Sequence, residues 1–268
     1  MIPIKDNIPT DRFAVVTATL ILINVVVYLI SISSGGSIWS GPAPDVVVHY
    51  GAIPFRFTHW GRDCGLIPDQ FGTAVTIGCQ GLNGVPAHFH HFLLGPDAPT
   101  IETAFTAMFM HGSLLHIAGN MLFLWIFGNN VEDSMGRVRF IIFYLLGGLV
   151  ALAGQIAVQP NSTAPTVGAS GAIAAVLGGY ILLYPRARVL TLVFIIFFVT
   201  VVELPALVVL GIWFVIQALY GAADLTHPTG GGGGVAYFAH IGGFLFGLAL
   251  IHVFAQRRKP MTPRYPVY

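Results

Sequence analysis

Charged side chains are scarce in this sequence. Asp, Glu, Lys and Arg together make up 9% of the 268 residues, whereas 55% of the residues are hydrophobic. A soluble domain carries charge at about a quarter of its positions, so this scarcity excludes a soluble globular protein and predicts an integral membrane protein. The net charge of +1 leaves no basic excess for nucleic acid, and no nucleic-acid partner is predicted.

Several catalytic motifs are also missing. There is no H-E-x-x-H sequence, which excludes a zinc protease of that type. No aspartate falls within the long apolar runs, which excludes an intramembrane aspartyl protease. Transporters and channels favour ionisable residues along a pathway and internal repeats, and neither is found beyond Glu203. No metal ion or cofactor is predicted.

Long apolar runs predict six membrane-spanning helices. About 20 residues are needed to cross about 30 Å of hydrocarbon at 1.5 Å per residue. The segment Val189 to Val202 is interpreted as a short interfacial piece before the fifth span, because Glu203 and Pro205 interrupt the apolar run. The six spans run from Phe13 to Ile32, from about Ala104 to Gly128, from about Phe140 to Val158, from Ser170 to Tyr184, from Leu204 to Tyr220 and from Val235 to Phe254.

Basic residues are distributed unevenly between the two sides of these spans. One side holds ten of the twelve Lys and Arg residues, and the other holds only Arg56 and Arg62. The positive-inside rule makes the richer side cytoplasmic. We therefore expect a multi-pass protein of the plasma or inner membrane with both termini in the cytoplasm. The ten residues are Lys5, Arg12, Arg137, Arg139, Arg186, Arg188, Arg257, Arg258, Lys259 and Arg264.

The loop after the first span, about Ser33 to Thr103, is predicted to be extracytoplasmic. It holds both cysteines, Cys64 and Cys79. In an oxidising compartment these are expected to form a disulfide, and otherwise they are two free thiols. Three histidines of this loop could hold a metal ion, but a solvated surface cluster is the favoured interpretation. They are His88, His90 and His91.

A serine stands between small residues at the start of the fourth span, in the sequence Val167 to Gly171 (VGASG). Small residues here either let two helices pack closely or hold Ser170 as a nucleophile on a tight turn. The predicted depth of His240 in the membrane favours the second interpretation, in which Ser170 is a nucleophile. Ser170 precedes Tyr184, and His240 precedes Phe254, by the same fourteen residues. Both side chains therefore lie about 21 Å above the cytoplasmic boundary.

Two polar side chains of the second span are expected near the same site. His116 and Asn120 are four residues apart, so they project from one face of a helix. Polar groups inside a membrane usually mark function or helix pairing, and a lone Asn would be interpreted as pairing. Small residues allow the helices that carry these groups to approach closely. These are Gly171, Ala175 and Gly179 on the fourth span and Gly243 and Gly247 on the sixth.

In this order, the motifs resemble those of the rhomboid family of intramembrane serine proteases. The resemblance covers about Thr100 to Ile251 and implies an all-α bundle of six transmembrane helices. It implies one domain over residues 1–268, with an extracytoplasmic loop 33–103, a core of about 100–254 and a cytoplasmic tail 255–268. The motifs are His111 to Asn120 (HGSLLHIAGN), Gly168 to Gly171 (GASG), Ala239 to Gly247 (AHIGGFLFG), and Glu132 and Gly136 before Arg139.

The resemblance also implies the chemistry. Ser170 would attack the scissile carbonyl, and His240 would serve as general base and then acid, in a dyad without a carboxylate. The side chains of His116 and Asn120, together with the Ser170 N–H, would stabilise the oxyanion. The residues that would support this site structurally are Gly168, Gly171 and His111.

The implied substrates are single-pass membrane proteins, cut near the outer surface of the membrane, and the other partner is membrane lipid. The oligomeric state is not implied. The alternative is a catalytically inactive relative that binds transmembrane helices, although such proteins typically lack one member of the dyad.

Two features depart from the family's pattern: the first outer loop is longer than usual, and position 174 is not aromatic. Many rhomboids have an aromatic residue four positions after the nucleophile, where it stacks on the catalytic histidine, and here that position is Ala174. The resemblance therefore does not predict what orients His240. The run Gly230 to Gly234 would be a flexible lid over the site or a plain linker.

Overall fold

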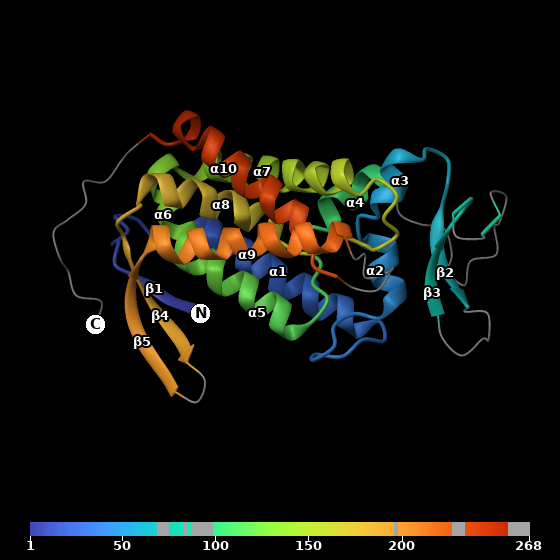
Figure 1. Cartoon of the computed structure of the whole chain (residues 1–268), viewed down its shortest axis with the longest axis horizontal. Helices are drawn as coiled ribbons and strands as arrows, with labels where there is room; N and C mark the ends of the chain where they lie inside the picture. The colour runs from blue at the N-terminus through green and yellow to red at the C-terminus, as the bar shows by residue number, and fades with distance from the viewer. Residues whose placement is uncertain (69–74, 83–84, 87–98, 196–197, 227–233, 257–268) are drawn as a thin grey trace.

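The chain folds into a bundle of long helices with a small sheet at each end (Figure 1). The structure is a computed structural model, and it describes residues 1–68, 75–82, 85–86, 99–195, 198–226 and 234–256. Within these residues, five helices are long and apolar enough to cross a membrane, which confirms the prediction of a multi-pass membrane protein. They are α1 (Val15–Ser33), the continuous run Leu114–Met135, α7 (Arg137–Val158), α9 (Ala206–Thr226) and α10 (Tyr237–Phe254).

The second spanning helix differs from its prediction at both ends. The sequence predicts it over about 104–128, but it comprises α5 (Leu114–Phe123), a π-helical turn η1 (Leu124–Gly128) and α6 (Asn129–Met135). Its start is fixed by Ser113, whose hydroxyl accepts the N–H of His116 at 3.2 Å as an N-cap.

The extra length of this helix places Glu132 in α6 rather than in the predicted loop. Its carboxylate accepts the backbone N–H groups of Val16 and Thr17 at 3.0 and 2.8 Å. These N–H groups belong to the first turn of α1 and have no partner within that helix. Glu132 therefore fastens α6 to the start of α1.

The helical bundle confirms the predicted all-α class of the membrane protein, and the connections between its helices add two small sheets. The loop after α1 contains α2 (Pro44–Tyr50), α3 (Pro54–Thr58), the antiparallel pair β2 (Cys64–Pro68) and β3 (Val75–Cys79), and α4 (Thr100–Thr106). At the opposite end, β1 (Ile2–Asp6), β4 (Arg188–Ile195) and β5 (Phe198–Pro205) form an antiparallel sheet in the order β1-β4-β5. Figure 1 shows these sheets at opposite ends of the bundle, which we name the hairpin end (β2, β3) and the sheet end (β1, β4, β5).

The segment Val189 to Val202, predicted as a short interfacial piece before the fifth span, forms most of the strands β4 and β5. This segment consists largely of Val, Ile, Thr and Phe, the β-branched and aromatic residues that favour strands. Its two halves pair with each other, and β1 from the start of the chain adds a third strand. An apolar run alone does not distinguish a paired hairpin from a buried helix, which is why the sequence did not predict these strands.

Helix α8 (Ser170–Leu183) is the shortest of the apolar helices in the bundle, with 14 residues or about 21 Å. Nearly all of its side chains are buried, because α10 and α7 pack extensively against it. Glycines permit the contact with α10. A Cβ on Gly178 would collide with the carbonyl oxygen of Phe244, and a Cβ on Gly247 with that of Ala175. Backbone-to-backbone approach of this kind is typical of small residues in membrane helices.

Candidate active site

Ser170 is the first residue of α8, and the chain reaches it through a turn that requires a glycine. Gly168 has a φ of +122°, a conformation that L side chains rarely adopt. Its N–H donates to the carbonyl of Ala107 at 2.8 Å. A Cβ at Gly168 would lie 2.8 Å from Nε2 of His116, so this glycine is needed both for the turn and for the close approach of α5. Gly171 packs α8 against α7, where a Cβ would lie 2.6 Å from that of Ala151.

The serine and the predicted histidine are in direct contact. Nε2 of His240, near the start of α10, lies 2.8 Å from Oγ of Ser170. On the other side of the ring, Nδ1 of His240 lies 2.8 Å from Oε1 of Gln217 in α9. An amide oxygen only accepts hydrogen bonds, so this contact favours the tautomer with the proton on Nδ1. The unprotonated Nε2 is then free to accept the Ser170 hydroxyl, as a general base must.

Gln217 was missed by the sequence analysis. It is buried, with 8% of its surface exposed, like His240 itself. The only signal available was a lone amide in an otherwise apolar run, which marks either function or helix pairing. Trp213, one turn earlier on α9, lies beside the same histidine with its ring centroid 5.7 Å away. Ala174 is fully buried, and the two α9 side chains contact the histidine in place of an aromatic residue there.

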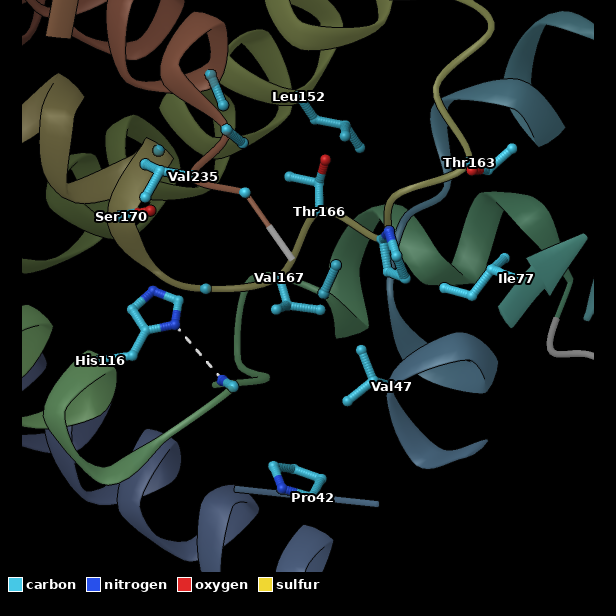
Figure 2. Close-up of a pocket in the computed structure, with 18 of the residues that line it drawn as sticks. Pro42, Val47, Ile77, His116, Leu152, Thr163, Thr166, Val167, Ser170 and Val235 are labelled. Carbon is cyan, nitrogen blue, oxygen red and sulfur yellow. Dashed lines mark hydrogen bonds between the residues drawn. The ribbon is translucent and has the colours of Figure 1, made fainter. Parts of the chain in front are cut away.

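The two polar residues of α5 bring hydrogen-bond donors to the turn beside Ser170. Nδ1 of His116 accepts the N–H of Gly112 at 3.4 Å (Figure 2), so the proton of a neutral ring is on Nε2. Nδ2 of Asn120 is buried and has no hydrogen-bond partner among the residues that the structure describes. The position a Cβ would take on Gly168 lies 2.8 Å from His116 Nε2 and 3.6 Å from Asn120 Nδ2. Both donors therefore converge on the same turn.

His111 lies just before α5 rather than inside a span. It is buried at 1% exposure, and its ring packs edge-on against that of His116 with centroids 5.1 Å apart. Its Nδ1 lies 3.3 Å from the carbonyl of Phe109. His111 thus packs against the ring of His116, in keeping with a structural role.

The site opens into a cavity of about 1180 Å³. Ser170, His116 and His240 line one part of it, and Val47 of α2 and Ile77 of β3 line another. Figure 2 shows the loop residues Thr166 and Val167 between these two parts. Asp, Glu, Lys and Arg are absent from the described residues that line the cavity. The volume exceeds that of most small-molecule pockets.

Cys64 and Cys79 lie opposite each other in the β2–β3 pair and are joined by a disulfide, with their Cα atoms 4.0 Å apart. The predicted histidine cluster, His88, His90 and His91, lies outside the described residues. So does the run Gly230 to Gly234, except for its last residue, which lines the cavity.

Comparison with known proteins matches residues 99–257 to the family model of the Rhomboid domain. The chain is 30% identical over 165 residues to Rhomboid protein 1, mitochondrial, of Saccharomyces cerevisiae, and 29% identical over 160 residues to Presenilin-associated rhomboid-like protein A, mitochondrial, of Danio rerio. It is 30% identical over 159 residues to RHOMBOID-like protein 12, mitochondrial, of Arabidopsis thaliana. These matches cover 59%, 57% and 53% of this chain but only 43%, 38% and 43% of the respective relatives. The chain therefore spans less than half the length of these relatives.

Proposed function

Because the chain belongs to the rhomboid family, we propose that it is an intramembrane serine endopeptidase with Ser170 as nucleophile and His240 as general base. The observation that carries the proposal is the 2.8 Å contact between His240 Nε2 and Ser170 Oγ. It is productive because Gln217 accepts from Nδ1 and leaves Nε2 free to take the serine proton. A serine and a histidine in this arrangement activate the hydroxyl for attack on a carbonyl.

The mechanism follows from the same geometry. Oγ of Ser170 attacks the scissile carbonyl carbon while its proton passes to Nε2 of His240. The carbonyl oxygen becomes an oxyanion, which accepts hydrogen bonds from His116 Nε2, Asn120 Nδ2 and the Ser170 N–H. That N–H belongs to the first turn of α8, where backbone donors have no partner within the helix. The protonated His240 then donates to the leaving amine, and a water molecule activated by the same nitrogen hydrolyses the acyl-enzyme.

The substrates we propose are single-pass membrane proteins. The uncharged cavity suits an apolar peptide. Helix α8 has only 14 residues, fewer than a full crossing needs, which supports a serine that lies inside the membrane. The alternative is an inactive relative that binds transmembrane helices. The intact Ser170–His240 contact favours the protease, because a binding protein has no need of a general base. The test is cleavage of a reporter single-pass protein by the purified chain in liposomes, and failure of a folded wild-type chain to cleave a panel of reporters would contradict the proposal.

For the orientation, we propose that the sheet end faces the cytoplasm in a plasma or inner membrane and that the hairpin end faces outward. Arg137, Arg139 and Arg188 lie at the sheet end, and the Cys64–Cys79 disulfide lies at the hairpin end, as the positive-inside rule and an oxidising exterior require. The three relatives carry the word mitochondrial in their names, and in a mitochondrial inner membrane the sheet end would face the matrix by the same rule.

The orientation predicts which introduced cysteines an impermeant thiol reagent reaches in intact cells. Asp45→Cys at the hairpin end should be labelled at once, and Pro263→Cys only after the membrane is permeabilised. The control is the parent chain, whose two cysteines are joined in the disulfide and should remain unlabelled. The reverse pattern would overturn the proposed orientation.

A further inference from the structure

The contact between His240 and Gln217 suggests a third participant in catalysis. We propose that Gln217 is a positioning residue, which acts through His240 by fixing the tautomer and orientation of its ring. This inference rests on the proposed protease function. It assigns to a residue of α9 the orientation of His240, a role that Ala174 cannot fill because it has no aromatic ring.

The ring of a neutral histidine carries one proton, and its position decides whether the residue can act as a base toward Ser170. With the proton on Nε2, the ring would donate to Oγ and could not accept the serine proton. Oε1 of Gln217 lies 2.8 Å from Nδ1 and stabilises the opposite tautomer, because it can only accept. In the described residues around the ring, the other hydrogen-bond partner is Ser170 itself.

The contact between Gln217 and His240 is shielded from solvent, which strengthens this control. Gln217 and His240 are each 8% exposed, so water competes little for Nδ1, and an unpaired buried donor is costly. His116 of α5 is a titratable residue on another element that lines the same cavity as His240. No carboxylate takes the place of Gln217 within the described residues that contact the ring.

Gln217 does not line the cavity, whereas His240 and Ser170 do. Its effect on catalysis must therefore pass through the histidine and not through contact with substrate. During acyl transfer His240 becomes positively charged, and the Nδ1–H···Oε1 hydrogen bond becomes charge-assisted and stronger. The amide thus stabilises the transition state more than the ground state, which is the condition for raising kcat.

The test compares Gln217→Leu with Gln217→Glu. Gln217→Leu keeps the approximate size and removes the acceptor, and we expect kcat for a reporter substrate to fall about 10- to 150-fold, the loss typical of a hydrogen bond to a charged group. KM should stay within about twofold, because no substrate contact is lost. Gln217→Glu retains an acceptor oxygen in either protonation state and should restore most of the activity. Ile216→Ala, an exposed neighbour on α9, is the matched control and should behave like the wild type.

A spectroscopic measurement separates positioning from packing. In the wild-type protein, the ¹⁵N NMR signals of His240 should show the proton on Nδ1, and in Gln217→Leu the population should move toward Nε2. A wild-type ring protonated on Nε2 would overturn the inference even if Gln217→Leu failed to fold. So would an unchanged kcat in a folded Gln217→Leu, whereas the protease function would stand as long as Ser170→Ala is inactive.

A separate observation concerns the far wall of the cavity. We infer that the β2–β3 hairpin binds the extended, uncharged segment that adjoins the transmembrane helix of the substrate on the hairpin side. The cavity is continuous from Ser170 to Leu66, Ile67, Val75 and Ile77 of the hairpin, and Figure 2 shows Ile77 across the cavity from Ser170. This inference also rests on the proposed function.

The hairpin is held firmly enough to act as a binding wall. The Cys64–Cys79 disulfide closes the hairpin. Both cysteines are buried in a small core with Val48 of α2, Ile53 of the turn after α2, and Phe55 of α3. A preformed wall avoids the entropy of ordering a loop when substrate binds. Because the described lining carries no Asp, Glu, Lys or Arg, it favours an apolar, uncharged peptide and disfavours charged ones.

Val75→Asp tests this wall, because Val75 lines the cavity but is 52% exposed, so the fold should tolerate the change. We expect kcat/KM for a reporter with an apolar flanking segment to fall about tenfold, the effect of about 1.4 kcal/mol in binding, while the rate of Ser170 labelling by a small fluorophosphonate stays unchanged. The matched control is Trp60→Asp, also exposed in the same loop but outside the cavity lining. Unchanged reporter cleavage in Val75→Asp would overturn the inference, and so would a parallel loss of labelling, which would assign the hairpin to the catalytic geometry instead.

Discussion

A fluorophosphonate probe is expected to label Ser170 covalently in the wild-type protein and to leave the Ser170→Ala variant unlabelled. The probe reacts with an activated serine, and the Ser170 hydroxyl lies 2.8 Å from Nε2 of His240, the nitrogen proposed to act as its base. Reporter cleavage should be lost together with labelling. Where a serine and a histidine act as one catalytic unit, removing the nucleophile lowers kcat by a factor on the order of 10⁶.

The same dependence predicts that the effects of two substitutions do not add. His240→Ala should reduce labelling and cleavage sharply, and the Ser170→Ala/His240→Ala double variant should be barely worse than either single variant. Ser134→Ala is the matched control, because Ser134 is also buried but lies in α6, with its hydroxyl donating to Val131. All variants should show the thermal unfolding of the wild type, since loss of fold would imitate loss of activity. Undiminished cleavage of the reporter by Ser170→Ala would contradict the proposal that proteolysis takes place at this site.

The second large effect is expected for Asn120→Ala, which removes an oxyanion donor and leaves the nucleophile in place. Removing one such donor typically slows the chemical step about 10²- to 10³-fold. Nδ2 of Asn120 has no other partner among the described residues, so the amide is free to serve the transition state. His116 and the Ser170 N–H remain as donors, and we expect Asn120→Ala to be slowed toward the lower end of that range and not abolished.

The measurement for Asn120→Ala is single-turnover cleavage of the reporter together with the rate of fluorophosphonate labelling. Both should fall, because the phosphonyl oxygen of the probe also needs the donors, while KM changes little. Asn24→Ala provides the control. Asn24 is a buried amide of α1 that donates to Leu20 within its own helix, so its loss should affect stability rather than rate. Wild-type rates in Asn120→Ala would remove Asn120 from the proposed mechanism.

The sequence alone predicted the membrane class, the positions of most spans and the pairing of Ser170 with His240. These predictions follow from properties that a single helix has by itself. Apolar length determines whether a segment spans the bilayer, and the fixed rise per residue determines the depth of each side chain. The two side chains at equal depth are the ones that the structure joins by a hydrogen bond. That His116 and Asn120 lie on the same side of their helix was predictable in the same way, because a spacing of four puts them on one helix face.

Two features were decided only by the tertiary structure, because they depend on how helices and strands pack against one another: the direction of the Gln217 side chain and the pairing of β4 with β5. Whether Gln217 faces lipid or His240 is set by the rotation of α9 about its axis, and an apolar helix with one amide does not specify that rotation. The glycine contacts between α8 and α10 bring their backbones together, and this close packing places His240 within reach of both Ser170 and α9. Likewise, Val189 to Val202 became a β-hairpin because its two halves and β1 pair with one another. The depth of a side chain in the membrane depends on its own helix alone. The face that a helix turns toward its neighbours and the pairing of strands depend on residues distant in the chain, which come together only in the folded molecule.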